Sequence, residues 1–292
     1  NSVIRRIRGQ YYDKHYSAIE RQKVLEMLKN DNEFIIKPSD SNNGFGISKL
    51  KIKDGQLFLG ENNTTFEEIE STYGNNFVIQ DVIQQHPVMA EPHPSSVNTL
   101  RMVTLRWKGQ IHYLLTFARF GSNNSVMDNA GAGGVCVGVS DTGEFLDVAI
   151  DEHCKTHTSH PTTGFEFKNL GKIPNFEKFI NFVKDLHTQI LHHDFVSWDI
   201  AVGIDGEPVF IEANFAGATW LYQMATRKPM FGDLTEEILE HVSNELQKGV
   251  NRDIYSRINE IRYKKLRRKK KKLKKKTKLL NKKVKKLEKE IN

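Results

Sequence analysis

The sequence predicts an α+β protein built around an antiparallel sheet. Strand-like and helix-like segments are mixed along its 292 residues, and several neighbouring strands are joined by short turns. With 38% hydrophobic and 10% aromatic residues, the chain has apolar material for one large domain or two lobes. No apolar run approaches the roughly 20 residues that span a bilayer. The two cysteines, Cys136 and Cys154, suggest no disulfide framework, so we expect a reducing, cytoplasmic setting.

Apolar periodicity locates the individual elements. An amphipathic helix is predicted over 15–30, where Ile19, Val24 and Leu28 recur near helical spacing. A short buried strand, 34–36, follows, and a polar, glycine-rich turn joins it to a second strand, 47–52. The other predicted strands are 77–82, 100–107, 111–119, 135–139, 145–150, 197–204 and 208–213, and the other helices are 176–192, 219–226 and 235–247.

The hairpin around residue 205 carries the clearest chemical signal. Its turn is Asp205-Gly206, which pairs Asp199 with roughly residue 212. Glu212 and Asn214 are two apart, so both side chains leave the same face of their strand. Carboxylates this close in an apolar segment repel unless a cation lies between them, and hard oxygen ligands suit Mg²⁺. The alternative is a pair of solvent-facing acids on an edge strand.

The first hairpin is a candidate phosphate site. Lys37 ends a buried strand, and the loop after it combines small polar side chains with two glycines. Such a loop can place backbone N–H groups over phosphate oxygens while the lysine supplies a positive charge. No Gly-Lys-Ser/Thr follows, so the loop is not a Walker A motif. Alone, an ordinary glycine-rich turn explains it equally well.

These residues resemble a known superfamily. Phe34-Ile35-Ile36-Lys37-Pro38-Ser39 and Gly44-Phe45-Gly46-Ile47-Ser48-Lys49 look like the phosphate-loop hairpin of ATP-grasp ligases, and Asp199-Ile200-Ala201-Val202 with Phe210-Ile211-Glu212-Ala213-Asn214 is similar to their metal signature. Five further motifs resemble one family of this superfamily, the sugar-transfer-associated ATP-grasp proteins, which are linked with bacterial surface-polysaccharide gene clusters. These motifs are Gln85-His86-Pro87, Asn98-Thr99-Leu100-Arg101, Asp128-Asn129, His160-Pro161-Thr162-Thr163-Gly164 and Trp198-Asp199. The resemblance implies an ATP-grasp fold, two α+β lobes with ATP between them.

The resemblance also implies roles for individual residues. The nucleotide and its phosphates would contact Lys37, the loop residues Ser39, Ser41, Asn42, Asn43, Gly44 and Gly46, and the adenine-reading strand Gln80, Asp81 and Val82. One or two Mg²⁺ ions would be held by Asp199, Glu212 and Asn214. Arg101 and Arg119 would stabilise the transferring phosphate, Asn129 would lie near the acceptor, and His160 and Thr163 would contact substrate. For the two arginines the alternative is pairing with an acid, and for Asn129 it is a plain turn.

One position departs from the superfamily pattern. Many amino-acid ligases of this superfamily carry an arginine two residues before the first metal acid, and here that position is Ser197. A separate cluster, His153, Cys154, His157 and His160, has metal-like spacing, but it lacks a second CxxC pair. We favour a substrate-facing loop over a zinc site there.

We expect four parts along the chain. They are an N-terminal helical segment (1–32), a small ATP-grasp lobe with the phosphate loop (33–85), a large lobe with the metal site (86–250) and a basic heptad helix (251–292). Because the sequence opens on Asn1 rather than Met, we expect the natural protein to extend further at this end.

The C-terminal tail differs sharply from the body. Residues 262–292 hold eighteen Lys or Arg against two acids, which leaves 25 basic and 34 acidic residues in 1–261 out of totals of 43 and 36. Leu266, Leu273, Leu280 and Leu287 recur every seven residues, which predicts a long helix or coiled coil. Three interpretations stay open: a homo-oligomeric coiled coil, association with an anionic membrane surface, and nucleic-acid binding. We favour the membrane, and the missing interleaved aromatics place nucleic acid last.

The predicted function is therefore ATP-dependent ligation. A carboxylate would become an acyl phosphate, and an amine would then displace phosphate to form an amide, on a sugar acid or amino acid of capsule or lipopolysaccharide synthesis. This assignment follows from the family resemblance alone. Two alternatives are a kinase that phosphorylates a hydroxyl and a non-catalytic nucleotide-binding scaffold at the membrane.

Overall fold

The computed structural model describes residues 2–28, 33–39, 46–123, 133–248, 269–271 and 277. The chain divides into two compact units, Asn1–Met230 and Phe231–Asn292. The first unit contains two antiparallel sheets of eight and seven strands, which confirms the predicted mixture of helices and antiparallel strands. No helix among the described residues is both long enough and apolar enough to cross a membrane.

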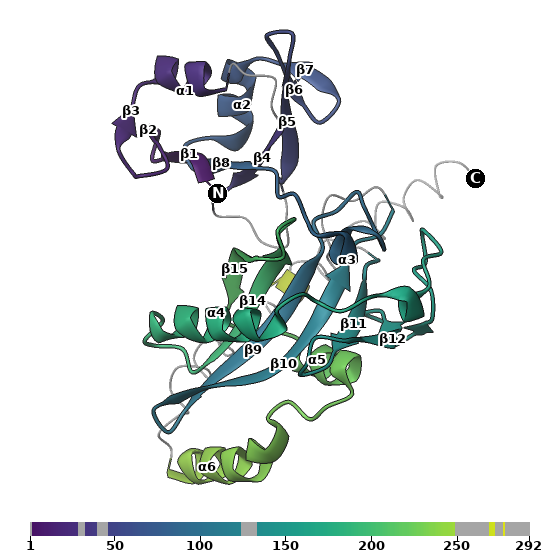
Figure 1. Ribbon diagram of the computed structural model, residues 1–292. Coiled ribbons are helices and arrows are strands. Elements are labelled where there is room, and N and C mark those ends of the chain that lie inside the picture. The colour runs from purple at the N-terminus through teal and green to yellow at the C-terminus, as the bar shows by residue number, and fades with distance from the viewer. Residues whose placement is uncertain are drawn as a thin grey trace, which may run out of the picture. The chain divides into compact units, whose positions relative to one another are not determined.

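The first sheet has the strand order β3-β2-β1-β8-β4-β5-β6-β7. Alternation along β4 sends Phe34 and Ile36 into a core shared with two helices, so that Lys37 leaves from the opposite face. Figure 1 shows the two helices, α1 and α2, beside this sheet. The elements are β1 (Ser2–Ile7), β2 (Gln10–Tyr12), β3 (Ala18–Ile19), α1 (Arg21–Met27), β4 (Glu33–Pro38), β5 (Ser48–Lys53), β6 (Gln56–Leu59), β7 (Asn62–Thr64), α2 (Phe66–Tyr73) and β8 (Phe77–Asp81).

The N-terminal segment, expected to be helical, is mostly strand. β1 pairs with β8 inside the first sheet, and the predicted helix over 15–30 is reduced to the seven residues of α1. Ile19, which fitted the helical spacing, belongs to β3. In β1 only Ile4 is fully buried, and Arg5 and Arg6 follow it directly, so the sequence shows little of the apolar alternation of a strand.

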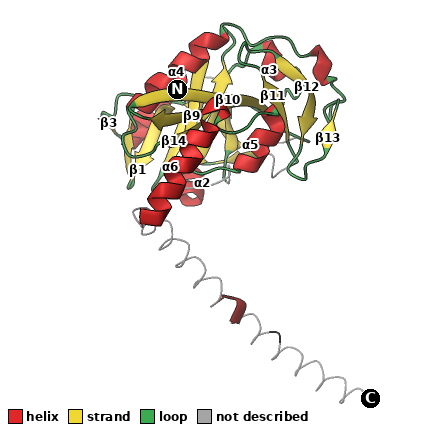
Figure 2. Cartoon of the chain, turned by 90° about the horizontal axis from the view of Figure 1, so that it is seen from below, coloured by secondary structure: helices red, strands yellow, loops and turns green. Residues whose placement is uncertain are grey.

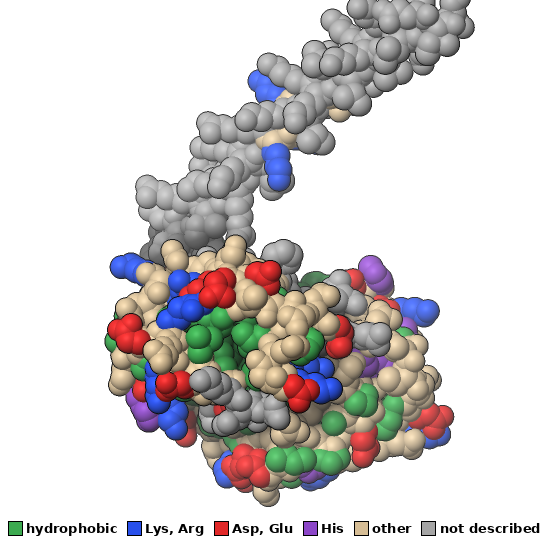
Figure 3. All heavy atoms as spheres, turned by 90° about the horizontal axis from the view of Figure 1, so that it is seen from above, with side chains coloured by type: hydrophobic (Ala, Val, Ile, Leu, Met, Phe, Trp, Pro, Cys, Tyr) green, Lys and Arg blue, Asp and Glu red, His purple; other side chains and the backbone are tan. Residues whose placement is uncertain are grey.

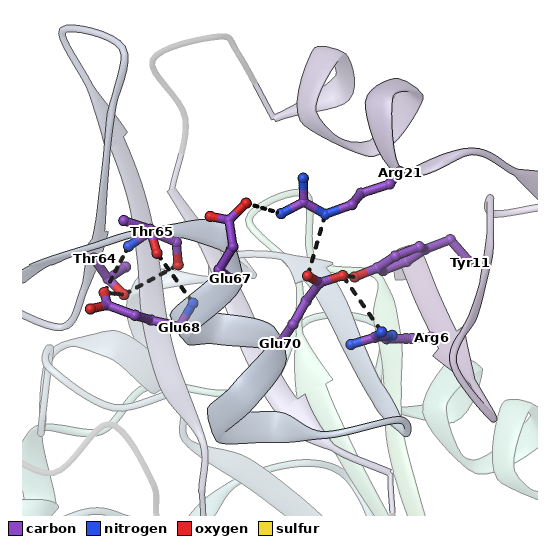
Figure 4. Close-up of polar contacts among 8 residues, drawn as sticks. All are labelled: Arg6, Tyr11, Arg21, Thr64, Thr65, Glu67, Glu68 and Glu70. Atoms are coloured by element: carbon purple, nitrogen blue, oxygen red, sulfur yellow. Dashed lines mark hydrogen bonds and ion pairs between the residues drawn. The ribbon is translucent and has the colours of Figure 1, made fainter.

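A network of charges ties the helices to this sheet (Figure 4). Glu70 on α2 accepts from the Tyr11 hydroxyl at 2.6 Å and from Arg21 Nε at 3.3 Å, and it lies 3.6 Å from Arg6. Burial and the neighbouring Glu70 raise the pKa of Tyr11, which keeps its hydroxyl a donor. Figure 3 views the molecule from above this sheet, where acidic and basic side chains lie side by side around hydrophobic ones. The network therefore joins β1, β2, α1 and α2.

Glu70→Ala should lower the free energy of unfolding by about 2 kcal/mol, because it removes the acceptor of the Tyr11 hydroxyl and one of the partners of Arg6 and of Arg21. Urea unfolding measures the change. The matched control is Glu61→Ala, whose side chain is 93% exposed and should change stability little. Equal effects of the two variants would contradict a stabilising network.

The second sheet carries the candidate site, in the order β13-β12-β11-β10-β9-β14-β15. α4 packs Phe179 and Val183 onto one face, where Trp198 and Ile200 belong to the same core, and α5 covers the opposite face (Figure 2). The elements are α3 (Pro87–Ala90), β9 (Thr99–Trp107), β10 (Gln110–Phe120), β11 (Val135–Val139), β12 (Phe145–Ile150), β13 (Thr156–His157), α4 (Phe176–Thr188), β14 (Phe195–Val202), β15 (Pro208–Asn214) and α5 (Thr219–Thr226). The second unit contributes α6 (Thr235–Lys248).

Candidate nucleotide and metal site

Strand register places three charged residues in one row across the second sheet. Asp199 on β14 lies opposite Glu212 on β15, as the Asp205-Gly206 turn predicts, and opposite Arg101 on β9. Residues directly opposite one another on neighbouring strands project from the same face. The row therefore runs acid, acid, base over three adjacent strands.

Asp199 is the centre of this cluster. Its carboxylate, 3% exposed, accepts from Arg101 Nε and, at 2.9 Å, from Arg101 Nη2. Arg119 on β10 donates from Nη1 to the same Oδ2 at 3.0 Å. Burial alone would lower the pKa of Arg101, but the adjacent Asp199 raises it above the ordinary value. Both arginines thus pair with the acid that the sequence predicts as a metal ligand.

Glu212 and Asn214 complete the predicted set of metal ligands. The Asn214 amide lies 3.4 Å from Asp199 Oδ2 and 3.3 Å from Glu212 Oε1. Loss of solvent around the Glu212 carboxylate and the adjacent Asp199 raise its pKa. Burial is the larger cause, and the negative charge of Asp199 adds to it; a divalent cation beside both carboxylates would act in the opposite direction. Among the described residues no group of three or more His, Cys, Asp or Glu side chains is placed to hold a metal ion. The set predicted from sequence adds the Asn214 amide oxygen to the two carboxylates, and oxygen ligands of this kind suit Mg²⁺.

Lys37 approaches this cluster from the first sheet. Burial lowers its pKa, and the negative charge of Glu212 acts in the opposite direction. The loop that starts here returns to the sheet through Gly46, whose φ is 80° and where a Cβ would lie 2.8 Å from Pro38 Cγ. Gly46 is therefore required by conformation and by close approach. Ser39 is exposed, and the other predicted loop residues, Ser41, Asn42, Asn43 and Gly44, lie outside the described residues.

The segment predicted to contact adenine lies at the end of β8, which pairs with β4, the strand that carries Lys37. Gln80 lies opposite Ile35 on β4 and donates to Ser2 Oγ at 3.1 Å, Asp81 ends β8, and Val82 follows it. Just beyond, the chain joins the second sheet, because His86 N donates to Val202 O at 2.9 Å. The segment that connects the two sheets is thus anchored at both ends.

His160 is buried and its ring nitrogens are occupied. Nε2 lies 2.8 Å from Gly121 O, and Nδ1 accepts the N–H groups of Thr162 and Thr163 at 3.3 Å. Thr163 in turn donates its hydroxyl to Pro92 O at 2.8 Å. In this arrangement both residues fix loops, and their contact with substrate stays a prediction. Asn129 lies outside the described residues.

The His/Cys cluster is not gathered around a common centre in the described part of the chain. His157 Nε2 lies 2.9 Å from Asp151, His160 belongs to the buried network above, and Cys154 is exposed. This arrangement gives no support to zinc.

One residue at the site, Tyr222, was not identified from sequence. Tyr222 on α5 accepts from Arg101 Nη1 at 2.9 Å. Ser197, the position where the superfamily resemblance predicts an arginine, is fully buried two residues before Asp199. The positive charge at this face comes instead from Arg101 and Arg119 on the neighbouring strands. The small residues around Gly217 were the one sequence signal of close packing near Tyr222.

Two antiparallel sheets that bear a lysine hairpin and an acidic hairpin define the class of ATP-grasp proteins. This chain belongs to the sugar-transfer associated ATP-grasp family, whose model matches residues 7–238.

Solved structures with detectable similarity are distant. An L-amino acid ligase from Bacillus licheniformis shares 12% identity, with a TM-score of 0.37 over 70% of this chain and 37% of that one. D-alanyl-alanine synthetase A from Vibrio cholerae shares 10%, with a TM-score of 0.41 over 76% and 55%. The C-terminal domain of a K. lactis ATP-grasp enzyme that interacts with an mRNA decapping enzyme shares 15%, with a TM-score of 0.33 over 73% and 58%. The chain thus spans less than two thirds of the length of each, and no curated protein sequence matches it significantly.

Proposed function

We propose that this protein is an ATP-dependent carboxylate–amine ligase. The observation that carries the proposal is the Asp199 cluster, which places two partly buried arginines and the carboxylates of Asp199 and Glu212 on one sheet face. Lys37 is close enough for the negative charge of Glu212 to act on its pKa. Transfer of a phosphoryl group needs cations around the phosphate oxygens more than it needs a covalent nucleophile. Family membership supports ATP as the donor.

Each group has a defined task in this proposal. Lys37 and the loop that follows it bind the phosphates, and Gln80 to Val82 face the adenine. Asp199, Glu212 and Asn214 would hold Mg²⁺, which when bound neutralises charge on the phosphates. Arg101 and Arg119 stabilise the phosphoryl group as the substrate carboxylate bonds to phosphorus and ADP leaves. The amine then attacks the acyl carbon, loses a proton and releases phosphate. Asn129, His160 and Thr163 stay proposed acceptor-side residues.

The substrate and setting belong to the same proposal. We propose as substrate a sugar acid or an amino acid joined during capsule or lipopolysaccharide synthesis, and the sugar-transfer name of the family supports the sugar. The basic tail, 262–292, is proposed to hold the protein at the inner, anionic face of the membrane, with its heptads as a homo-oligomeric scaffold.

Turnover with defined product balance tests the function. Mg²⁺·ATP is incubated with pools of uronic acids and amino acids, and ADP and free phosphate are followed together. A ligase releases them in equal amounts only when both an acid and an amine are present. ADP with a stable phosphoester would instead identify a kinase. Nucleotide binding with no turnover in any pool would favour a scaffold.

The affinity for Mg²⁺ and β,γ-imido-ATP should fall as pH rises toward 10, because Lys37 loses its proton at a lower pH than the ordinary lysine value of about 10.4. Burial lowers the pKa of Lys37, so its neutral amine, which no longer attracts phosphate, forms at a lower pH than that of an exposed lysine. Lys37→Arg keeps its charge and should remove this alkaline fall, whereas the control Lys172→Arg should retain it. Calorimetric titration from about pH 7 to 10 measures the difference. An unchanged fall in Lys37→Arg would exclude Lys37 as its source.

A further inference from the structure

Arg101 is anchored from two sides of its guanidinium. Nε and Nη2 donate to Asp199, and Nη1 donates to the hydroxyl of Tyr222 at 2.9 Å. A guanidinium has five N–H groups, so these three contacts leave two, one on each terminal nitrogen. Such a pair forms the fork that binds a carboxylate or a phosphate with two parallel hydrogen bonds.

Tyr222 is itself held firmly. The side chain is 2% exposed, and its ring lies 5.1 Å from the ring of Phe117, centroid to centroid. Its carbonyl accepts from Thr226 Oγ1 at 2.8 Å within α5. At Gly217 a Cβ would lie 2.0 Å from the Tyr222 hydroxyl, so the residue there must be glycine for the hydroxyl to keep its place. The hydroxyl thus occupies a slot between Gly217 and Arg101.

The two anchors of Arg101 differ in what else they must do. Asp199 also bonds Arg119, and in the proposed function it contributes to binding Mg²⁺. Arg101 therefore competes with two other cations for the oxygens of Asp199. Among the described residues, the Tyr222 hydroxyl bonds no cation other than Arg101. It would keep its hydrogen bond to the guanidinium if Asp199 also held a metal ion.

We infer that Tyr222 is a positioning residue, which holds the free fork of Arg101 toward an oxyanion of the bound nucleotide or acid. The inference rests on the proposed function and adds a residue from α5 to it. A tyrosine present only for core packing would behave like phenylalanine here, because the ring contact with Phe117 does not need the hydroxyl. The hydroxyl is therefore the group to test.

A double-mutant cycle tests the inference. Four full-length proteins are compared: wild type, Tyr222→Phe, Arg101→Lys and the double variant. Tyr113→Phe is the matched control, because Tyr113 is also largely buried and donates at 2.9 Å to Thr116 on its own strand, without contacting an arginine of the cluster. The affinity for Mg²⁺ with β,γ-imido-ATP is measured by calorimetry, and urea unfolding is followed for every protein.

Tyr222→Phe should weaken binding by about tenfold, as expected for a lost hydrogen bond to a charged group, with an unfolding midpoint close to that of Tyr113→Phe. In the Arg101→Lys background the same change should have no further effect, since the hydroxyl acts through Arg101. Gly217→Ala should weaken binding in the same direction by displacing the hydroxyl.

Two results would overturn the inference in distinguishable ways. Wild-type affinity in Tyr222→Phe, or an equal tenfold loss in the Arg101→Lys background, would reject the positioning role and leave the proposed function intact. A wild-type chain that binds no nucleotide would reject both.

Discussion

Asp199→Asn should abolish turnover, with a loss of about a thousandfold or more, because one change removes the shared acceptor of two arginines and a proposed metal ligand. Asparagine has nearly the same size, so the sheet can keep its register. What changes is the charge: Arg101 and Arg119, each 13% exposed, lose the carboxylate that bonds both.

The same substitution should also lower stability. Removing one partner of a buried ion pair leaves the others uncompensated, which typically costs about 3–5 kcal/mol. Urea unfolding and nucleotide titration measure the two effects separately. The control is Asp147→Asn, since Asp147 is an exposed carboxylate on β12 of the same sheet and should alter neither quantity. Near-normal stability and Mg²⁺·nucleotide binding in Asp199→Asn would contradict the central role given to this residue.

The hairpin that carries Asp199 and Glu212 was predictable because its information is local. An Asp-Gly turn fixes the register of the two strands, and the observed pairing follows from it. The arginine contacts are not local. Arg101 reaches Asp199 across 98 positions of sequence, through a neighbouring strand whose place in the sheet is set by the whole fold. Sequence could therefore name these residues but not predict that they bond one another.

One helix was missed from sequence because charged residues obscure its apolar spacing. The helix α2 was not predicted, although Thr65 and Glu68 form a capping box at its start and Phe66 and Ile69 are buried. Three acids among its eight residues, Glu67, Glu68 and Glu70, obscure the apolar spacing. Tyr222 illustrates a different limit, since its helix was predicted correctly while nothing in the sequence tells which side chain of that helix touches Arg101.

Arg119→Met should separate catalysis from metal binding by moving them in opposite directions. Arg119 Nη1 lies 3.0 Å from Asp199 Oδ2, so it competes with a cation for that oxygen. Without Arg119, Asp199 is freer to bind a metal, and affinity for Mg²⁺ in the absence of nucleotide should rise several-fold. Turnover should fall by about a hundredfold or more, because a cation that stabilises the phosphoryl group is lost.

Calorimetric titration with Mg²⁺ alone gives the first quantity, and release of ADP gives the second. Lys172→Met serves as the control, because its ammonium is 55% exposed and pairs with Glu144 away from the cluster. A general loss of structure would lower both quantities together, so the opposite signs distinguish competition for Asp199 from damage to the fold. If Mg²⁺ affinity falls while the unfolding midpoint stays unchanged, Arg119 does not compete with the metal. In that case the arginines and the metal would bind different oxygens of Asp199 at the same time, and the cluster would already be arranged for nucleotide.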